Sequence, residues 1–175
     1  AFMNRFPLMP VEDEGRLNDA RLRENFIERV FVYKRWQNFV QNDGSRKGLV
    51  DFHTDHKLLV MAHSLKHLSE LGKLVAQVKA IEPKELHDQY LSILMTALKL
   101  NATIKKNVNV LQHIMGYFKK QLSSDEKQEL LEVIGNYHKG LIPMIVPITL
   151  LNHFVRKYDE AYLKAFNAIV PPLAR

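Results

Sequence analysis

Residues 103–122 read TIKKNVNVLQHIMGYFKKQL, and this stretch predicts a helix whose two sides differ. At about 100° per residue, one side carries apolar residues: Ile104, Val108, Leu111, Met115, Phe118 and Leu122. The other side carries Lys106, Asn109, Val110, His113, Tyr117 and Lys120. We expect the first side to face a core. The second side is expected to face solvent or a ligand.

The second side of this helix is cationic. Between Asp88 and Asp125 the chain has no carboxylate, whereas it has Lys99, Lys105, Lys106, Lys119 and Lys120. Uncompensated lysines with an aromatic ring among them suit a polyanion, because bases stack on rings while lysines neutralise phosphates. The 25 Lys and Arg outnumber the 19 Asp and Glu, which favours nucleic acid, an anionic membrane surface or an acidic partner. The alternative is a solvated lysine surface without a ligand.

Upstream of this stretch the sequence predicts four more helices. The first begins at an N-cap, Asn18 or Asp19, and runs to about residue 41. Its expected core side contains Leu22, Phe26, Val30, Tyr33, Trp36 or Gln37, and Val40, and its expected basic side contains Arg21, Arg29, Lys34 and Arg35. A basic loop over 42–48 and helices over 49–63, 65–79 and 83–100 follow. Residues 1–18 are rich in proline and acidic residues and are expected to form an extended linker.

Downstream, Ser123 and Glu126 form a capping box that begins a helix, and Gly140 ends it. Residues 141–158 are apolar nearly all round, so they are expected to form a central buried helix. Asp159 is expected to cap a final helix. The predicted fold is therefore all-α, a single-domain bundle of about seven or eight helices around a buried apolar helix. This helical domain would span 19–175.

Several chemistries are missing from the sequence. Without cysteine, the chain has no disulfide, thiolate nucleophile or iron–sulfur ligand. It contains no phosphate-binding glycine loop and no G-x-S-x-G nucleophile motif. The longest apolar run, 141–151, is interrupted by Pro143 and Pro147 and is too short to span a bilayer. We therefore expect a cytoplasmic chain that is not catalytic by itself and holds no cofactor. Its start at Ala1 suggests a fragment or a trimmed product.

Four histidines are the strongest sign of an enzyme. On one unbroken helix over 49–67, His53, His56, His63 and His67 would lie within an arc of about 80°. The spacing of His63 and His67 is one that metal ligands use. However, Ser64 is expected to interrupt the helix, and no Glu follows the first histidine as in zinc proteases. We therefore expect no metal site, and the histidines would bond in the core or flank the basic side.

Two segments carry a family resemblance. The segments 48–76, GLVDFHTDHKLLVMAHSLKHLSELGKLVA, and 109–119, NVLQHIMGYFK, resemble the YbgA family of small helical domains. The residues that match the family pattern are His53, Lys57, His63, Ser64, Asn109, His113, Gly116, Tyr117 and Gly140. His56 and His67 depart from it, since the family more often has aromatic rings there, and the tail 165–175 lacks the usual ending. The opening 7–31 is similar to the junction behind a thiouracil-desulfurase-like, TudS-type domain.

This resemblance implies a two-domain enzyme that removes sulfur from thiolated uridine, with 4-thiouridine in tRNA as the natural target. The N-terminal TudS-like domain would hold the iron–sulfur cluster, and the present chain would be an accessory domain that presents the tRNA. The expected RNA-binding residues are Arg35, Arg46, Lys47, Lys57, Lys105, Lys106, Asn109, His113, Tyr117, Lys119 and Lys120. His53, His63 and Ser64 are candidates for the same cleft. Two alternatives remain, a helical protein-interaction or scaffold domain and a small histidine-based metal-dependent enzyme.

Overall fold

A computed structural model describes residues 5–160 and 162–163, and every regular element in this part of the chain is helical. The all-α prediction is confirmed. The elements are η1 (Gly15–Asn18), α2 (Ala20–Asn42), α3 (Arg46–His63), α4 (Leu65–Ala76), α5 (Pro83–Leu98), α6 (Ile104–Tyr117), α7 (Ser124–His138) and α8 (Ile145–Lys157). They form two compact units, Ala1–Asn101 and Ala102–Arg175, each of which has its own set of buried residues.

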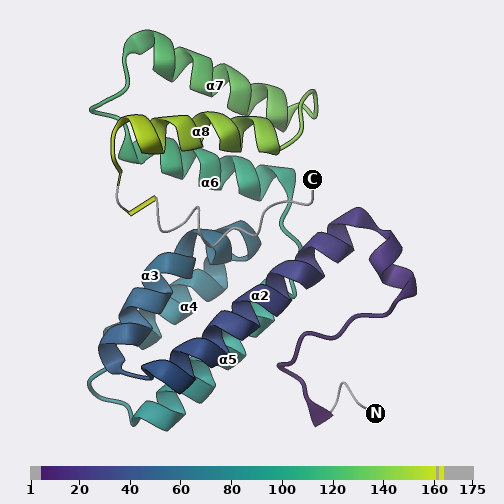
Figure 1. Cartoon of the computed structure of the whole chain (residues 1–175), viewed down its shortest axis with the longest axis vertical. Helices are drawn as coiled ribbons and strands as arrows, with labels where there is room; N and C mark the ends of the chain where they lie inside the picture. The colour runs from purple at the N-terminus through teal and green to yellow at the C-terminus, as the bar shows by residue number, and fades with distance from the viewer. Residues whose placement is uncertain (1–4, 161, 164–175) are drawn as a thin grey trace. The chain divides into compact units, whose positions relative to one another are not determined.

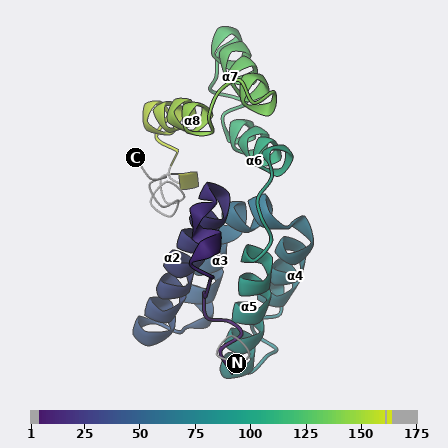
Figure 2. The same ribbon diagram turned by 90° about the vertical axis from the view of Figure 1, so that its right-hand side faces the viewer.

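The first unit packs α2, α3, α4 and α5 side by side (Figures 1 and 2). Its centre is aromatic. The rings of Trp36 and Tyr90 are stacked, with centroids 5.2 Å apart, and Phe52 meets Trp36 edge-on at 5.3 Å. Tyr90 and the leucines around it are fully buried. Rings of this size bury large apolar areas, so they account for much of the stability of this core.

The buried side of α2 agrees with the expected one at Trp36 but differs from it elsewhere. Its buried residues are Asn25, Arg29, Val32 and Trp36, whereas Val30 and Val40 are more than 40% exposed. Arg29 therefore does not lie on a solvent-facing basic side. The side-chain amide of Asn25 donates to the Leu98 carbonyl at 2.9 Å, so this polar group is buried at little cost. Apolar spacing alone predicts the wrong buried side for this helix, because its core positions include polar residues that have hydrogen-bond or ion-pair partners.

Side chains with oxygen atoms begin the helices of this unit. Asp19 caps α2, as predicted, by accepting from the backbone N–H groups of Arg21 and Leu22. Ser45 accepts from the Gly48 N–H at 2.9 Å. Because of that cap, α3 already begins at Arg46, and the predicted loop over 42–48 is shorter than expected.

The second unit packs α6, α7 and α8 against one another (Figure 2). The predicted capping box is present at the start of α7, since Ser123 and Glu126 each accept from the other's backbone N–H. Gly140 has a φ of +74° and ends α7, as predicted. In that conformation the Leu141 N–H reaches the Asn136 carbonyl at 3.0 Å and satisfies one of the last carbonyls of the helix.

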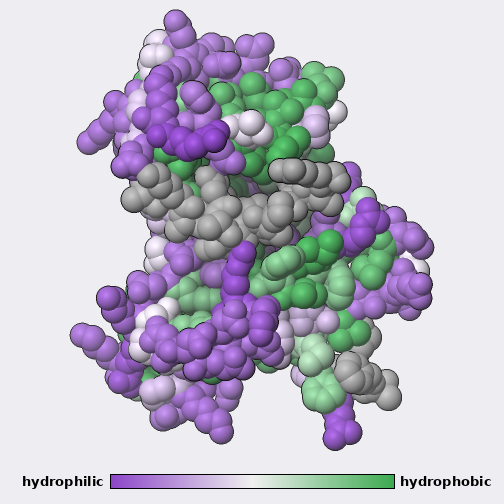
Figure 3. Space-filling model, viewed as in Figure 1, coloured by the Kyte–Doolittle hydropathy of each residue, from purple (hydrophilic) through white to green (hydrophobic). Residues whose placement is uncertain are grey.

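The prediction of a central buried helix over 141–158 is wrong. In α8 the buried residues are Pro147, Leu151, Phe154 and Val155. Ile145 and Val146 are 49% and 39% exposed, and hydrophobic side chains are visible over α8 in Figure 3. Two neighbouring helices cover only one side of a third, so an apolar composition does not by itself bury the whole helix. None of the described helices is long and apolar enough to cross a membrane.

Asp159 belongs to the end of α8. It has a φ of +55°, and the Glu160 N–H donates to the Val155 carbonyl at 3.1 Å. This arrangement closes α8 in the way that Gly140 closes α7. Of the final helix predicted beyond Asp159, only Glu160, Tyr162 and Leu163 fall within the described residues, and the rest lies outside them.

Candidate nucleic-acid interface

The exposed side of α6 carries three of the predicted RNA-binding residues. Thr103 caps the helix by accepting from the Lys106 N–H at 3.3 Å. From there Lys105, Asn109 and His113 lie on the solvent side, while Lys106 is half-buried. The predicted assignment of residues to the two sides of this helix is wrong at two positions. Val110, expected on the solvent or ligand side, is 5% exposed, and Ile104, expected on the core side, is 39% exposed. The buried side of α6 is rotated toward Val110 because two helices, α7 and α8, pack against it.

Aromatic rings lie next to these polar groups. The His113 and Tyr117 rings meet edge to face, with centroids 5.6 Å apart. Tyr117 also stacks on Tyr162, with centroids 5.2 Å apart and an interplanar angle of 29°. Tyr117 is half-buried as a result. Its ring contacts two other rings, so a base would have to use the part that remains accessible.

Lys119 and Lys120 follow α6 in an exposed turn. Phe118 precedes them and is fully buried, which anchors the turn and directs the two lysines outward. Lysines just beyond a helix C-terminus are also favoured by its negative dipole end. Among the described residues, no carboxylate pairs with Lys105, Lys119 or Lys120. These three cations are therefore available to phosphate groups.

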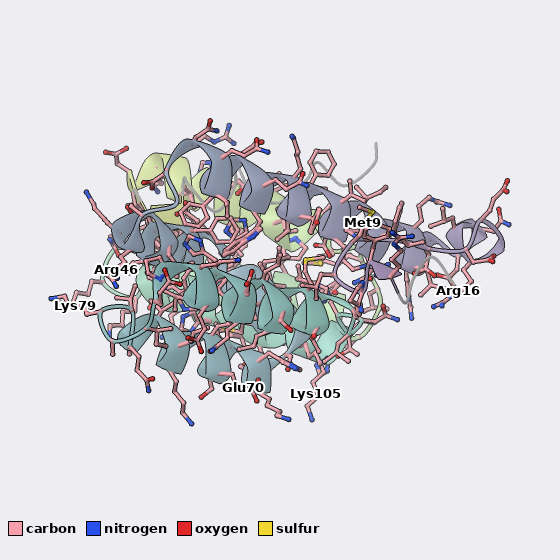
Figure 4. The ribbon with its side chains drawn as sticks, turned by 90° about the horizontal axis from the view of Figure 1, so that it is seen from below. Met9, Arg16, Arg46, Glu70, Lys79 and Lys105 are labelled. Carbon is pink, nitrogen blue, oxygen red and sulfur yellow. The ribbon has the colours of Figure 1, made fainter. Side chains whose placement is uncertain are left out.

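In the first unit, Arg46 and Lys47 occupy the first turn of α3 and are exposed. The Arg46 guanidinium donates to the Ile81 carbonyl at 3.2 Å, which ties α3 to the connection between α4 and α5. Figure 4 shows Arg46 and Lys79 at the same end of this unit. Lys79 was not among the predicted binding residues, because its position predicted the end of a helix over 65–79. It is an exposed cation on that connection.

Arg35 and Lys57 are half-buried and differ from open surface cations. Burial lowers the pKa of the Arg35 guanidinium. Burial and then the charge of Lys57 lower the pKa of His53. His53 Nδ1 lies 3.1 Å from the Tyr90 hydroxyl, whose pKa is raised by burial. A neutral His53 that accepts from this hydroxyl is consistent with both shifts, so His53 is positioned by the core.

The other three histidines of the 49–67 region, His56, His63 and His67, have structural partners. His56 Nδ1 donates to the Phe52 carbonyl at 2.8 Å, and burial lowers the pKa of His56 to about 4. His63 is buried, with Nδ1 bonded to the Leu100 carbonyl and Nε2 3.2 Å from Glu28. Ser64 caps α4.

His67 Nδ1 lies 2.8 Å from the hydroxyl of Ser64, the residue that interrupts the helix as expected. Across residues 5–160 and 162–163, no three His, Cys, Asp or Glu side chains gather as metal ligands. The four histidines are thus used separately.

Glu126 connects the ends of α7 and α8. Hydrogen bonds from Lys157, from the Ser123 backbone and from the Tyr158 hydroxyl lower the pKa of Glu126 to about 2. This carboxylate is therefore engaged within its own unit. Its negative charge is compensated by Lys157.

The predicted binding residues are divided between the two units. Arg35, Arg46, Lys47 and Lys57 belong to the first unit, and those from Lys105 to Lys120 belong to the second. The densest group of exposed cations and polar rings is on α6 and the turn that follows it. We call Lys105, Asn109, His113, Tyr117, Lys119 and Lys120 the α6 surface.

Comparisons with known proteins support the resemblance to the YbgA family. The chain is 28% identical over 148 residues to "Uncharacterized protein YbgA" of Escherichia coli (strain K12), a match that covers 84% of this chain and 88% of that protein. No solved structure matches the chain. A family described as "Protein of unknown function (DUF1722)" matches residues 57–169, which include all of α4 to α8. The chain belongs to this DUF1722 family.

Proposed function

We propose that this chain is an RNA-binding accessory domain that presents thiolated tRNA to an iron–sulfur desulfidase domain, either fused to it or separate. The observation that carries the proposal is the α6 surface. There Lys105, Lys119 and Lys120 are exposed without carboxylate partners among the described residues, and they lie in sequence beside the His113–Tyr117 ring pair. Lysines neutralise phosphates and rings accept unstacked bases, which is how single-stranded parts of RNA are bound.

The test is a titration of the chain with unmodified tRNA, thiolated tRNA and duplex DNA of equal length at several salt concentrations. For phosphate contacts, the logarithm of affinity should fall linearly with that of salt, by roughly 0.7 to 0.9 for each neutralised phosphate. We expect tRNA to bind more tightly than DNA. Equal affinity for tRNA and DNA would contradict the proposal.

Charge reversal locates the surface. Lys119→Glu with Lys120→Glu should weaken tRNA binding at least tenfold. The affinity should also depend less steeply on salt, by the amount expected for the loss of about two phosphate contacts. The matched control is Lys127→Glu with Lys139→Glu, because these are also exposed lysines of the second unit and give the same change in charge. A control that weakens binding as much as the first pair would show that only net charge matters.

A helical protein-interaction domain is the second candidate. It is favoured by apolar side chains that remain exposed around the start of α8: Leu141, Ile145 and Val146. Ile145 and Val146 line a shallow groove of about 440 Å³ between α7 and α8, together with Val133 and Leu150. Two results together would favour this function over the first. The chain would not bind RNA, and it would associate with itself or with another protein in a way that Val146→Asp abolishes.

A further inference from the structure

A cavity of about 350 Å³ lies in the first unit, between the N-terminal segment and α2. Its charged lining groups are Glu12, Arg16, Arg29 and Lys99. Met9, labelled with Arg16 in Figure 4, also lines it. The volume is within the range of small-molecule sites, which begins at roughly 300 Å³. None of these residues belongs to the α6 surface.

The cations of this cavity are only partly compensated. Glu12 accepts from Arg29 at 2.9 Å and from Arg16 at 3.2 Å. Lys99 donates to the Pro7 carbonyl at 2.9 Å, a neutral partner. Three cations therefore face one carboxylate, and the site keeps two positive charges.

Arg29 is the most informative of these groups. Its side chain is 7% exposed, far less than is usual for arginine. Its Nε–H is buried without an acceptor among the described residues. A buried donor without a partner is costly, and a guanidinium has five donors arranged to hold an oxyanion at two points. Glu12 accepts from one terminal nitrogen of Arg29, whereas the Nε–H has no acceptor among the described residues.

We propose that this cavity binds a small phosphate monoester. Such a group carries about two negative charges near neutral pH and three acceptor oxygens, which complements the two uncompensated cations. A carboxylate would leave one of them unpaired. Met9, Val11 and Leu22 line the same cavity and provide apolar contact for the organic part of the molecule. Glu12 holds the arginines in place when no phosphate is bound.

Calorimetric titration of the full chain with adenosine 5′-monophosphate, adenosine and inorganic phosphate tests the proposal. We expect one equivalent of the monophosphate to bind, inorganic phosphate to bind more weakly and adenosine not to bind. Failure of the monophosphate to bind at millimolar concentration, or equal binding of adenosine, would overturn it. The same titration followed by NMR should shift the Arg29 Nε–H signal, and an unmoved signal would place any binding elsewhere.

Variants separate the site from general charge. Lys99→Met and Arg16→Met should each weaken monophosphate binding about fivefold, since each removes one charge-assisted contact at an exposed position. The matched control is Arg21→Met, an exposed arginine of α2 outside the cavity. Glu12→Gln removes the competing charge and should tighten binding about threefold. Weaker binding by Glu12→Gln, or an equal loss in Arg21→Met, would contradict the assignment.

Discussion

The two units bury different kinds of residue. In the first unit, polar residues are buried with the apolar ones: Asn25, Arg29, His56, His63 and Ser64. Among the described residues of the second unit, the buried side chains are apolar or aromatic. The first core is thus specified by hydrogen bonds as well as by packing, whereas the second is specified by packing and helix caps.

The largest effect expected is in the second unit. Phe118→Ala removes a fully buried ring that lies against Phe154 and Tyr158. It should lower the free energy of unfolding by about 3–5 kcal/mol, because the cavity cannot collapse completely. Chemical denaturation followed by circular dichroism measures this. Phe31→Ala, at a ring that is 47% exposed, is the control, and a similar loss in both variants would contradict a packed second core.

The second prediction concerns pH and the first unit. Because the folded pKa of His56 is about 4 and its ordinary value is 6.5, the unfolded chain binds the proton more readily. Stability is therefore complete above pH 6.5 and should fall by on the order of 3 kcal/mol as the pH drops to about 4. His53, whose pKa is also lowered, acts in the same direction.

Fluorescence of Trp36, the single tryptophan, reports on this unit because the ring is buried against Tyr90. Denaturation at a series of pH values gives the free energy of unfolding as a function of pH. Its slope between about pH 4 and pH 6.5 should be smaller for His56→Phe than for the wild type. His138→Gln, at an exposed histidine of α7, should leave the slope unchanged. A wild-type slope in His56→Phe would show that His56 does not titrate as described.

A third prediction addresses the buried polar bonds of the first unit. Asn25→Ala removes the donor to the Leu98 carbonyl and leaves that carbonyl without its partner. The free energy of unfolding should fall by about 1–3 kcal/mol. Denaturation followed by Trp36 fluorescence checks this value, with Asn38→Ala on the exposed side of α2 as the control. If both variants are as stable as the wild type, the bond does not help to specify this core.

The smallest effect is expected at the capping box of the second unit. Ser123→Ala removes the acceptor for the Glu126 N–H, and loss of such a cap costs about 1 kcal/mol. Thermal unfolding followed by circular dichroism should show a lower midpoint. Ser124→Ala changes a neighbouring exposed serine that accepts no cap bond and should be neutral. Equal effects of both substitutions would mean that the cap does not hold the start of α7.

Helix starts and stops were predictable from sequence because they depend on local chemistry. Asp19 and Ser123 cap helices, Ser64 separates two helices, and Gly140 ends one, as expected. In each case a side-chain oxygen or a positive φ satisfies backbone groups within a few residues. The capping role of Ser45 went unnoticed, because the basic composition of 42–48 favoured a loop there.

For the candidate site, the sequence predicted the exposure of some residues correctly and of others incorrectly. Lys105, Lys119, Lys120 and His113 are exposed, as an RNA-binding role requires, and their roles remain predictions. Arg35 and Lys57 are half-buried, and His63 serves within the first unit. Sequence spacing shows which residues share a side of a helix. It does not show how many other helices cover that side.

The sequence by itself determined the helical class, most helix boundaries and the cationic character of the α6 region. Those features depend on interactions within a turn or two of helix. Only the tertiary structure decided that Arg29 is buried beside Glu12, that α8 is covered on one side, and that a charged cavity lies next to α2. Burial of a polar group depends on whether a partner far away in the chain can reach it, and local periodicity carries no information about that partner.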